Sequence, residues 1–172
     1  TSAKTPVANI TIMLNITIIA VGKLKEQYLR DASAEYQKRL STLCKLNIVE
    51  INPEKLSDNP SAKEIENALN NEAKKIIEKI PKGAKVYSMC IEGKQRSSEE
   101  LSREIDSLAT MGVSNIVFII GGSFGLSDEV KNLSFFRLSM SKMTFPHQIA
   151  RIILLEQIYR ATQMSIGTRY QK

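Results

Sequence analysis

Short apolar, β-branched runs alternate along this chain with longer segments of helical spacing, and no other feature restricts its fold as strongly. The runs at residues 14–21, 46–51, 86–91, 115–120 and 137–140 indicate strands. Helical spacing of apolar positions marks residues 24–43, 65–80, 101–108, 128–133 and 146–164. This alternation predicts an α/β domain with a mainly parallel sheet. The run Asn115–Ile120 is nearly all apolar, which is typical of a strand covered by helices on both faces.

Local signals predict several element boundaries and a single domain. Ser61 and Ser97 each stand three residues before a glutamate, which is the pattern of a helix capping box. Pro146 suits the first turn of the last helix. No internal repeat or low-complexity linker divides the chain, so we expect one domain over residues 13–172. We expect residues 1–12 to be an expression leader and Met13 to be the natural start.

Charge and composition restrict the class of partner. The formal net charge of +6 and the pI near 9.3 favour a polyanion such as RNA, although a merely basic surface explains them equally well. Cys44 and Cys90 lie in or beside apolar runs, which favours buried thiols over a disulfide. His147 is the single histidine, which argues against a structural zinc site. No run approaches the ~20 apolar residues of a membrane span, so we expect a soluble, cytoplasmic protein.

Three turns at predicted strand ends are candidates for a ligand site, because parallel sheets bind ligands at the carboxyl ends of their strands. Gly121-Gly-Ser-Phe-Gly125 follows a buried strand, and Glu92-Gly-Lys94 follows another. The first matches neither a phosphate-binding Walker loop nor the dinucleotide fingerprint, and a structural turn is an equal reading. The turn at residues 140–145, rich in Met, Ser and Thr, could enclose an adenine or be an ordinary buried connection.

The last predicted helix is apolar around most of its circumference, which indicates burial and, in a small chain, a subunit interface. His147 and Arg151 share one face near its start. A histidine there is more often structural than catalytic. The basic, aromatic tail with Tyr170 suits contact with phosphates and an unpaired base, or is simply a frayed terminus.

Taken in order, these segments resemble the RlmH family, the pseudouridine N3-methyltransferases of large-subunit ribosomal RNA in the SPOUT class. The resemblance covers essentially all of residues 13–172. It rests on the segments Ala20-Val-Gly-Lys23, Ile91-Glu-Gly-Lys94, Phe118-Ile-Ile-Gly-Gly-Ser123 with Gly125-Leu126, Ser139-Met-Ser-Lys-Met-Thr-Phe-Pro-His-Gln148, and the helix that begins at Arg151.

The resemblance implies a SPOUT-type α/β knot, with a C-terminal trefoil that the general rule against knots would have excluded. It implies S-adenosylmethionine as cofactor and no metal. It further implies a homodimer that packs the last helices together, and large-subunit RNA of the assembled 70S ribosome as substrate, with neither membrane nor DNA as a partner. The cofactor pocket implied by the family consists of Met89, where relatives often carry Leu, Gly121, and the run Met140, Ser141, Lys142, Met143, Thr144 and Phe145.

The reaction requires in-line alignment of nucleophile, methyl carbon and sulfur, and loss of the N3 proton of pseudouridine. His147, Arg151 and Tyr170 are the side chains we would assign to base or anion-stabilising roles, and His147 could instead only shape the pocket. Relatives commonly end in Tyr-His, whereas this tail reads Tyr170-Gln171, and Gln171 cannot titrate. The alternatives are a SPOUT enzyme with another RNA target, such as a ribose 2′-O-methyltransferase, and a non-catalytic ribosome-associated RNA-binding protein.

Overall fold

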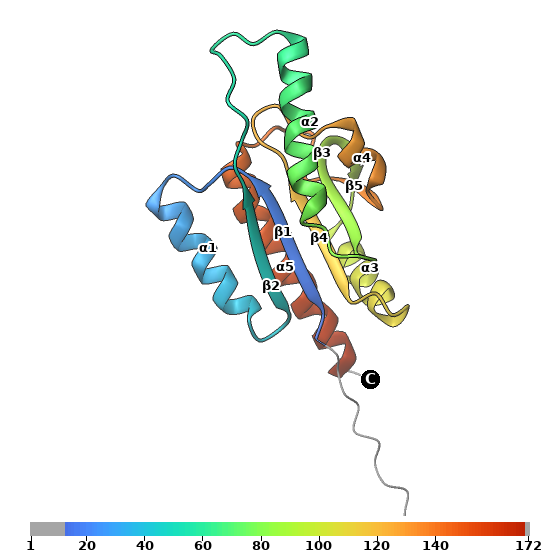
Figure 1. The fold of residues 1–172 in the computed structure, drawn as a ribbon. Helices are drawn as coiled ribbons and strands as arrows, with labels where there is room; N and C mark the ends of the chain where they lie inside the picture. Colours follow the sequence, from blue (N-terminus) through green and yellow to red (C-terminus); the bar gives the residue numbers. More distant parts are fainter. Residues whose placement is uncertain (1–12, 171–172) are drawn as a thin grey trace, which may run out of the picture.

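A computed structural model describes residues 13–170, with side chains to residue 165, so the expected leader at residues 1–12 lies outside the described residues. Strands and helices alternate as the sequence predicts (Figure 1). The strands form one sheet in the order β2-β1-β4-β3-β5, and each neighbouring pair is parallel. The elements are β1 Asn15–Val21, α1 Gln27–Leu40, β2 Lys45–Ile51, α2 Ala62–Glu78, β3 Lys85–Gln95, α3 Ser98–Thr110, β4 Asn115–Ile120, α4 Asp128–Leu133, β5 Phe136–Ser139 and α5 His147–Tyr170.

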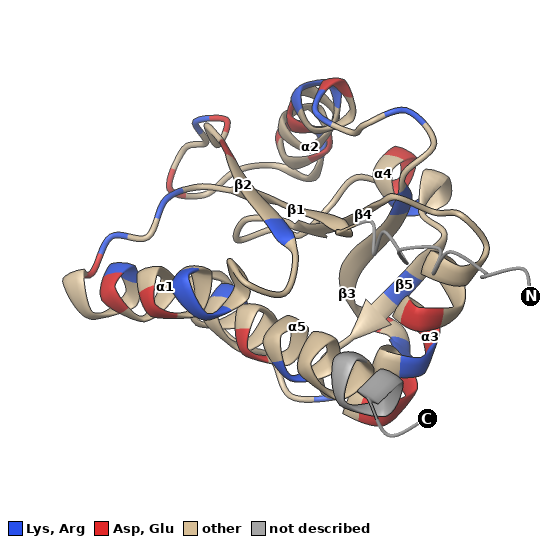
Figure 2. Cartoon of the chain, turned by 90° about the horizontal axis from the view of Figure 1, so that it is seen from below, with Lys and Arg blue, Asp and Glu red and all other residues tan. Residues whose placement is uncertain are grey.

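Helices cover both faces of the sheet, as predicted. Figure 2 shows α1, α3 and α5 on one side of the strands and α2 and α4 on the other. The central strands divide their side chains by the two-residue period of a strand. Ile18 and Phe118 pack towards the layer of α1, α3 and α5, whereas Ile19 and Ile119 pack towards α2 and α4. All four are fully buried, and burial of each stabilises the fold by roughly 1.5–3 kcal/mol.

The helix starts follow local hydrogen bonds. At α2 the capping box is complete, because Ser61 Oγ accepts from the Glu64 amide while the Glu64 carboxylate accepts from the Ser61 amide. At α3 the structure has the serine half, in which Ser97 Oγ accepts from the Glu100 amide. The helix α5 begins at His147, directly after Pro146, and continues past the predicted end at residue 164.

Helix α1 and strand β3 differ from their predicted bounds for tertiary reasons. Helix α1 begins at Gln27 rather than near residue 24, because Arg30 donates to the carbonyls of Leu24 (3.1 Å) and Lys25 (2.5 Å) and holds the preceding segment as a loop. Strand β3 runs beyond residue 91 through a bulge, in which both Met89 and Lys94 pair with one residue of β5.

Three features bear on what this fold can bind. Cys44 and Cys90 are free and buried, as predicted. Within residues 13–170 no helix is long and apolar enough to cross a membrane. No cluster of metal-ligating side chains occurs in that same part of the chain.

Candidate functional site

A cavity of about 750 Å³ opens at the carboxyl ends of β3, β4 and β5. Three turns form it: the end of β3 with its bulge, the glycine-rich loop after β4, and the connection from β5 to α5. Parallel strands place these turns at one edge of the sheet, which is where α/β proteins collect ligands. The three turns singled out in the sequence therefore do meet in space.

The glycine-rich loop forms one wall and turns back on itself. The Gly125 amide donates to the Gly122 carbonyl at 3.1 Å, and Gly125 has a φ of +79°, which an L side chain rarely adopts. A Cβ at Gly121 would collide with the Gly125 carbonyl group. Because neither glycine has a side chain, the peptide groups of this loop line the cavity directly.

The connection from β5 to α5 forms the opposite wall without regular secondary structure. Ser139 Oγ donates to the Ser141 carbonyl at 3.0 Å, and the Met143 amide donates to Ser141 Oγ at 3.0 Å. These two bonds link successive residues of the turn. The expected cofactor residues that line the cavity are Met89, Gly121, Met140, Ser141, Met143, Thr144 and Phe145, whereas Lys142 is exposed and does not line it.

Of the three expected catalytic residues, only His147 lines the cavity among the described side chains. It is half-buried at the start of α5, next to the turn. Burial lowers the pKa of His147, and the nearby Arg151 and Lys25 cations lower it further. The imidazole is therefore neutral at neutral pH and has a ring nitrogen that can accept a proton.

Arg151 lies one turn further along α5 and does not line the cavity. Its buried guanidinium donates from Nη1 to Glu50 Oε2 at 2.6 Å and from Nη2 to the Gly22 carbonyl at 2.8 Å. These contacts join α5 to the ends of β1 and β2. The geometry favours a role in holding His147 and its surroundings, rather than direct contact with a ligand in the cavity.

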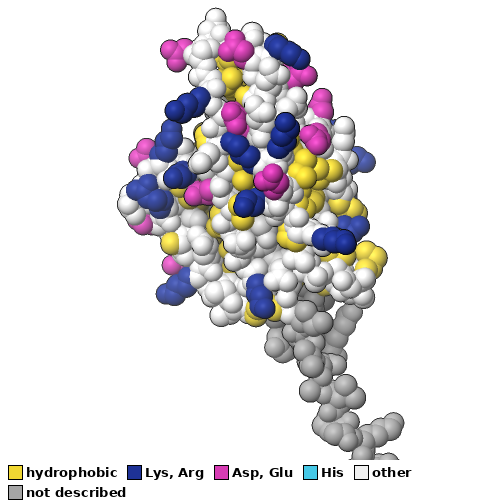
Figure 3. Space-filling view, in the orientation of Figure 1, with side chains coloured by type: hydrophobic (Ala, Val, Ile, Leu, Met, Phe, Trp, Pro, Cys, Tyr) yellow, Lys and Arg dark blue, Asp and Glu magenta, His cyan; other side chains and the backbone are white. Residues whose placement is uncertain are grey.

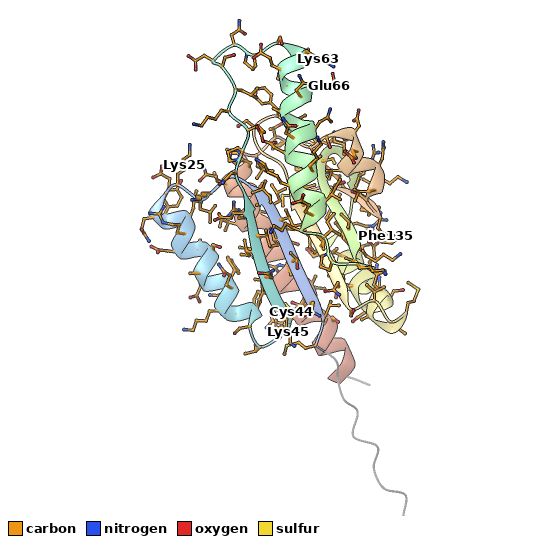
Figure 4. The ribbon with its side chains drawn as sticks, viewed as in Figure 1. Lys25, Cys44, Lys45, Lys63, Glu66 and Phe135 are labelled. Atoms are coloured by element: carbon orange, nitrogen blue, oxygen red, sulfur yellow. The ribbon has the colours of Figure 1, made fainter. Side chains whose placement is uncertain are left out.

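The β1–α1 loop is fastened to the same end of α5. The Lys25 amide donates to Gln148 Oε1 at 2.8 Å, and Figure 4 shows Lys25 on this loop. Lys23 and Lys25 are exposed on this loop, and Tyr28, in the first turn of α1, exposes 65% of its surface. The Lys25 cation therefore lies near His147, whose pKa it helps to lower. Tyr170 ends α5, but its side chain and Gln171 lie outside the described residues.

One charged side chain of the cavity wall, that of Lys131, was not predicted from the sequence. Lys131 of α4 lines the cavity and pairs with Glu92 of the β3 bulge at 2.6 Å. The loop that contains Glu92 was singled out in the sequence, but Lys131 is a single cation on a short helix, and no local pattern distinguishes it. Only the fold brings the two side chains together.

Comparison with known proteins identifies relatives along nearly the whole chain. Residues 14–171 match the family described as "Predicted SPOUT methyltransferase". Two proteins named "Ribosomal RNA large subunit methyltransferase H" are similar to this chain. The one from Clostridioides difficile (strain 630) is 51% identical to it, and the one from Clostridium novyi (strain NT) is 53% identical. Each alignment covers 92% of this chain and 100% of the relative.

A solved structure supports the fold. It belongs to "a probable methylase family protein" from Haemophilus influenzae Rd KW20, with a TM-score of 0.52 and 11% sequence identity. The match covers 92% of this chain and 70% of that one. At this identity the likeness concerns the fold alone.

Proposed function

This chain belongs to the SPOUT methyltransferase family, and we propose that it transfers the methyl group of S-adenosylmethionine to N3 of a pseudouridine in large-subunit ribosomal RNA. One observation carries the proposal. Apart from Lys142, all the residues expected to hold the donor surround a single cavity. The relatives named as large-subunit ribosomal RNA methyltransferases support the class of substrate. The C-terminal knot follows from family membership.

The cavity fits the proposed donor in size and chemistry. Its volume of about 750 Å³ is within the range of small-molecule sites. Leu138, Met140 and Phe145 offer apolar contact for an adenine, while the side-chain-free loop at Gly121 offers peptide groups for hydrogen bonds. When bound, S-adenosylmethionine supplies an activated methyl group on a sulfonium, so the chain needs to supply position and proton transfer only.

His147 is the residue best placed to receive the N3 proton. It lines the cavity, and its lowered pKa keeps the imidazole neutral at neutral pH. A neutral ring nitrogen can take the proton as the lone pair on N3 becomes available. Arg151 holds the start of α5 through Glu50 and Gly22, and its positive charge would favour a developing anion nearby. Tyr170 remains the proposed contact for the target base.

A homodimer through α5 is part of the proposal. The inner side of α5 packs against the sheet between α1 and α3, where Leu154, Leu155 and Ile158 are buried. Its other side leaves Ile149 39% exposed and Ile153 half-buried, whereas Ile152 packs against the core. Apolar side chains on that side suit a second copy of the helix. The partner subunit would then help to deliver the base.

The β1–α1 loop supports an RNA approach to the His147 side of the cavity. Lys23 and Lys25 offer cations for phosphates, and the exposed ring of Tyr28, in the adjoining first turn of α1, offers a surface for stacking on an unpaired base. Figure 3 shows cations and anions intermixed on the visible face rather than one uniform basic patch. With ribosomes as substrate, the enzyme would act in the cytoplasm.

The proposal is tested with labelled S-adenosylmethionine and ribosomes from cells that lack this methyl group. We expect the label on N3 of one pseudouridine, identified by mass spectrometry of nuclease fragments, and little label on free RNA. Label on a ribose 2′-oxygen would instead indicate a different SPOUT activity. If the cofactor neither binds nor raises the melting temperature, a non-catalytic RNA-binding role replaces the proposal.

A further inference from the structure

An ion pair in the cavity wall has no role in the function proposed above. Glu92 Oε1 and Lys131 Nζ lie 2.6 Å apart, and both residues line the cavity. The lysine side chain is 21% exposed and the glutamate side chain 55%. One residue comes from β3 and the other from α4, so the pair spans two of the elements around the cavity.

Backbone packing fixes the position of each partner. The β3 bulge at Glu92 depends on Gly93, where a Cβ would lie 2.5 Å from the Arg137 carbonyl oxygen of β5. Lys131 follows Val130, whose side chain is completely buried. The Val130 amide donates a hydrogen bond to Oγ of Ser127, the N-cap residue of α4. The two charged ends therefore meet at a defined point of the wall.

The surroundings of Glu92 favour its ionised form. The bond from Lys131 lowers the pKa of the Glu92 carboxyl, and Arg137 acts in the same direction. The Arg137 guanidinium is itself engaged, because it donates to Asn132 Oδ1 at 2.7 Å and to the Lys131 carbonyl at 3.3 Å. The cavity wall thus presents the Glu92 carboxylate directly beside Lys131 Nζ.

We propose that Glu92 and Lys131 bind the amino-acid end of the methyl donor, with Lys131 on its α-carboxylate and Glu92 on its α-ammonium. This inference rests on the proposed function, because it assumes that the donor occupies this cavity. An α-amino acid is a zwitterion whose charges lie as close together as those of the pair, so the two pairs of charges are complementary. Opening a partly exposed ion pair costs little. In the complex, Glu92 and Lys131 each contact the oppositely charged group of the ligand. Because the bound ligand displaces water from the cavity wall, each of these contacts becomes stronger.

Two ligands separate this subsite from the rest of the cavity. S-adenosylhomocysteine carries the amino-acid end, and 5′-methylthioadenosine shares its adenosine and thioether but lacks that end. Binding of both is measured by titration calorimetry on the full chain. We expect Lys131→Gln and Glu92→Gln each to weaken S-adenosylhomocysteine binding about tenfold and to leave 5′-methylthioadenosine binding within about twofold. Lys94→Gln is the matched control, because Lys94 is exposed on the same strand and does not line the cavity.

The outcomes distinguish this inference from the proposed function. Wild-type protein that binds S-adenosylhomocysteine no more tightly than 5′-methylthioadenosine overturns the inference, and so do variants that bind S-adenosylhomocysteine normally. Equal losses for both ligands assign the pair a structural role and overturn it as well. Wild-type protein that binds neither ligand overturns the proposed function instead.

Discussion

Replacing Arg151 by glutamine tests how the start of α5 is held. The guanidinium connects this helix to the ends of β1 and β2, through Glu50 at 2.6 Å and the Gly22 carbonyl at 2.8 Å. The residue is 3% exposed, so water cannot replace the lost donors inside the protein. Glutamine retains part of the apolar stem of arginine, but it is uncharged and too short to contact Glu50 and the Gly22 carbonyl together.

The expected loss of stability follows from these contacts. A hydrogen bond to a charged group contributes about 1.5–3 kcal/mol. The Glu50 side chain is 38% exposed and regains water when its partner is removed, so its bond counts for less. We expect the free energy of unfolding to fall by about 2–3 kcal/mol. In a chain of this size that corresponds to a melting temperature lower by roughly 4–12 °C.

The same substitution changes His147 in a way that a general loss of packing would not. The Arg151 cation is one cause of the lowered pKa of His147, so its removal raises that pKa. Urea unfolding measures the stability, and histidine NMR resonances measure the pKa. Glu50→Gln is the control, because it leaves the cation in place and is not expected to raise the pKa. Unchanged unfolding energy together with an unchanged His147 pKa in the Arg151 variant would refute the reasoning.

Three further predictions concern cofactor binding and turnover. Gly121→Ala forces the loop away from the Gly125 carbonyl and is expected to weaken S-adenosylhomocysteine binding at least about tenfold, whereas Gly122→Ala, whose Cβ meets only ordinary contacts, leaves calorimetric affinity nearly unchanged. His147→Gln is expected to lower turnover by about 100-fold. Because the pKa of His147 lies below 6.5, wild-type turnover should fall as the pH drops below that value, and a pH–rate profile of the variant should lack this acidic decline. The folded protein also loses stability in that range, since the unfolded chain binds the proton more readily. Tyr170→Ala is expected to lower turnover on ribosomes more than cofactor affinity, and a variant with normal turnover and poor cofactor binding would contradict that role.

The sequence alone determined most of the secondary structure and the location of the cavity. Strand and helix periods depend on residues a few positions apart, so Asn115–Ile120 was predicted to the residue and the start of α2 followed from the Ser61 cap. The parallel order of the elements placed the glycine loop and the turn at residues 140–145 at one sheet edge. The spacing of residues in these turns did not identify their ligand. The resemblance to the RlmH family indicated S-adenosylmethionine.

Only the tertiary structure decided which charged groups meet. Arg151 and Glu50 are 101 positions apart, and the pairing depends on α5 returning beneath β1 and β2. Lys131 of α4 meets Glu92 within the bulge of β3, and nothing near either residue in the sequence encodes that approach. Local periodicity reports which face of an element is buried. The partner of a single charged side chain is decided by the path of the whole chain, because such a contact forms only between elements that the packed sheet brings together.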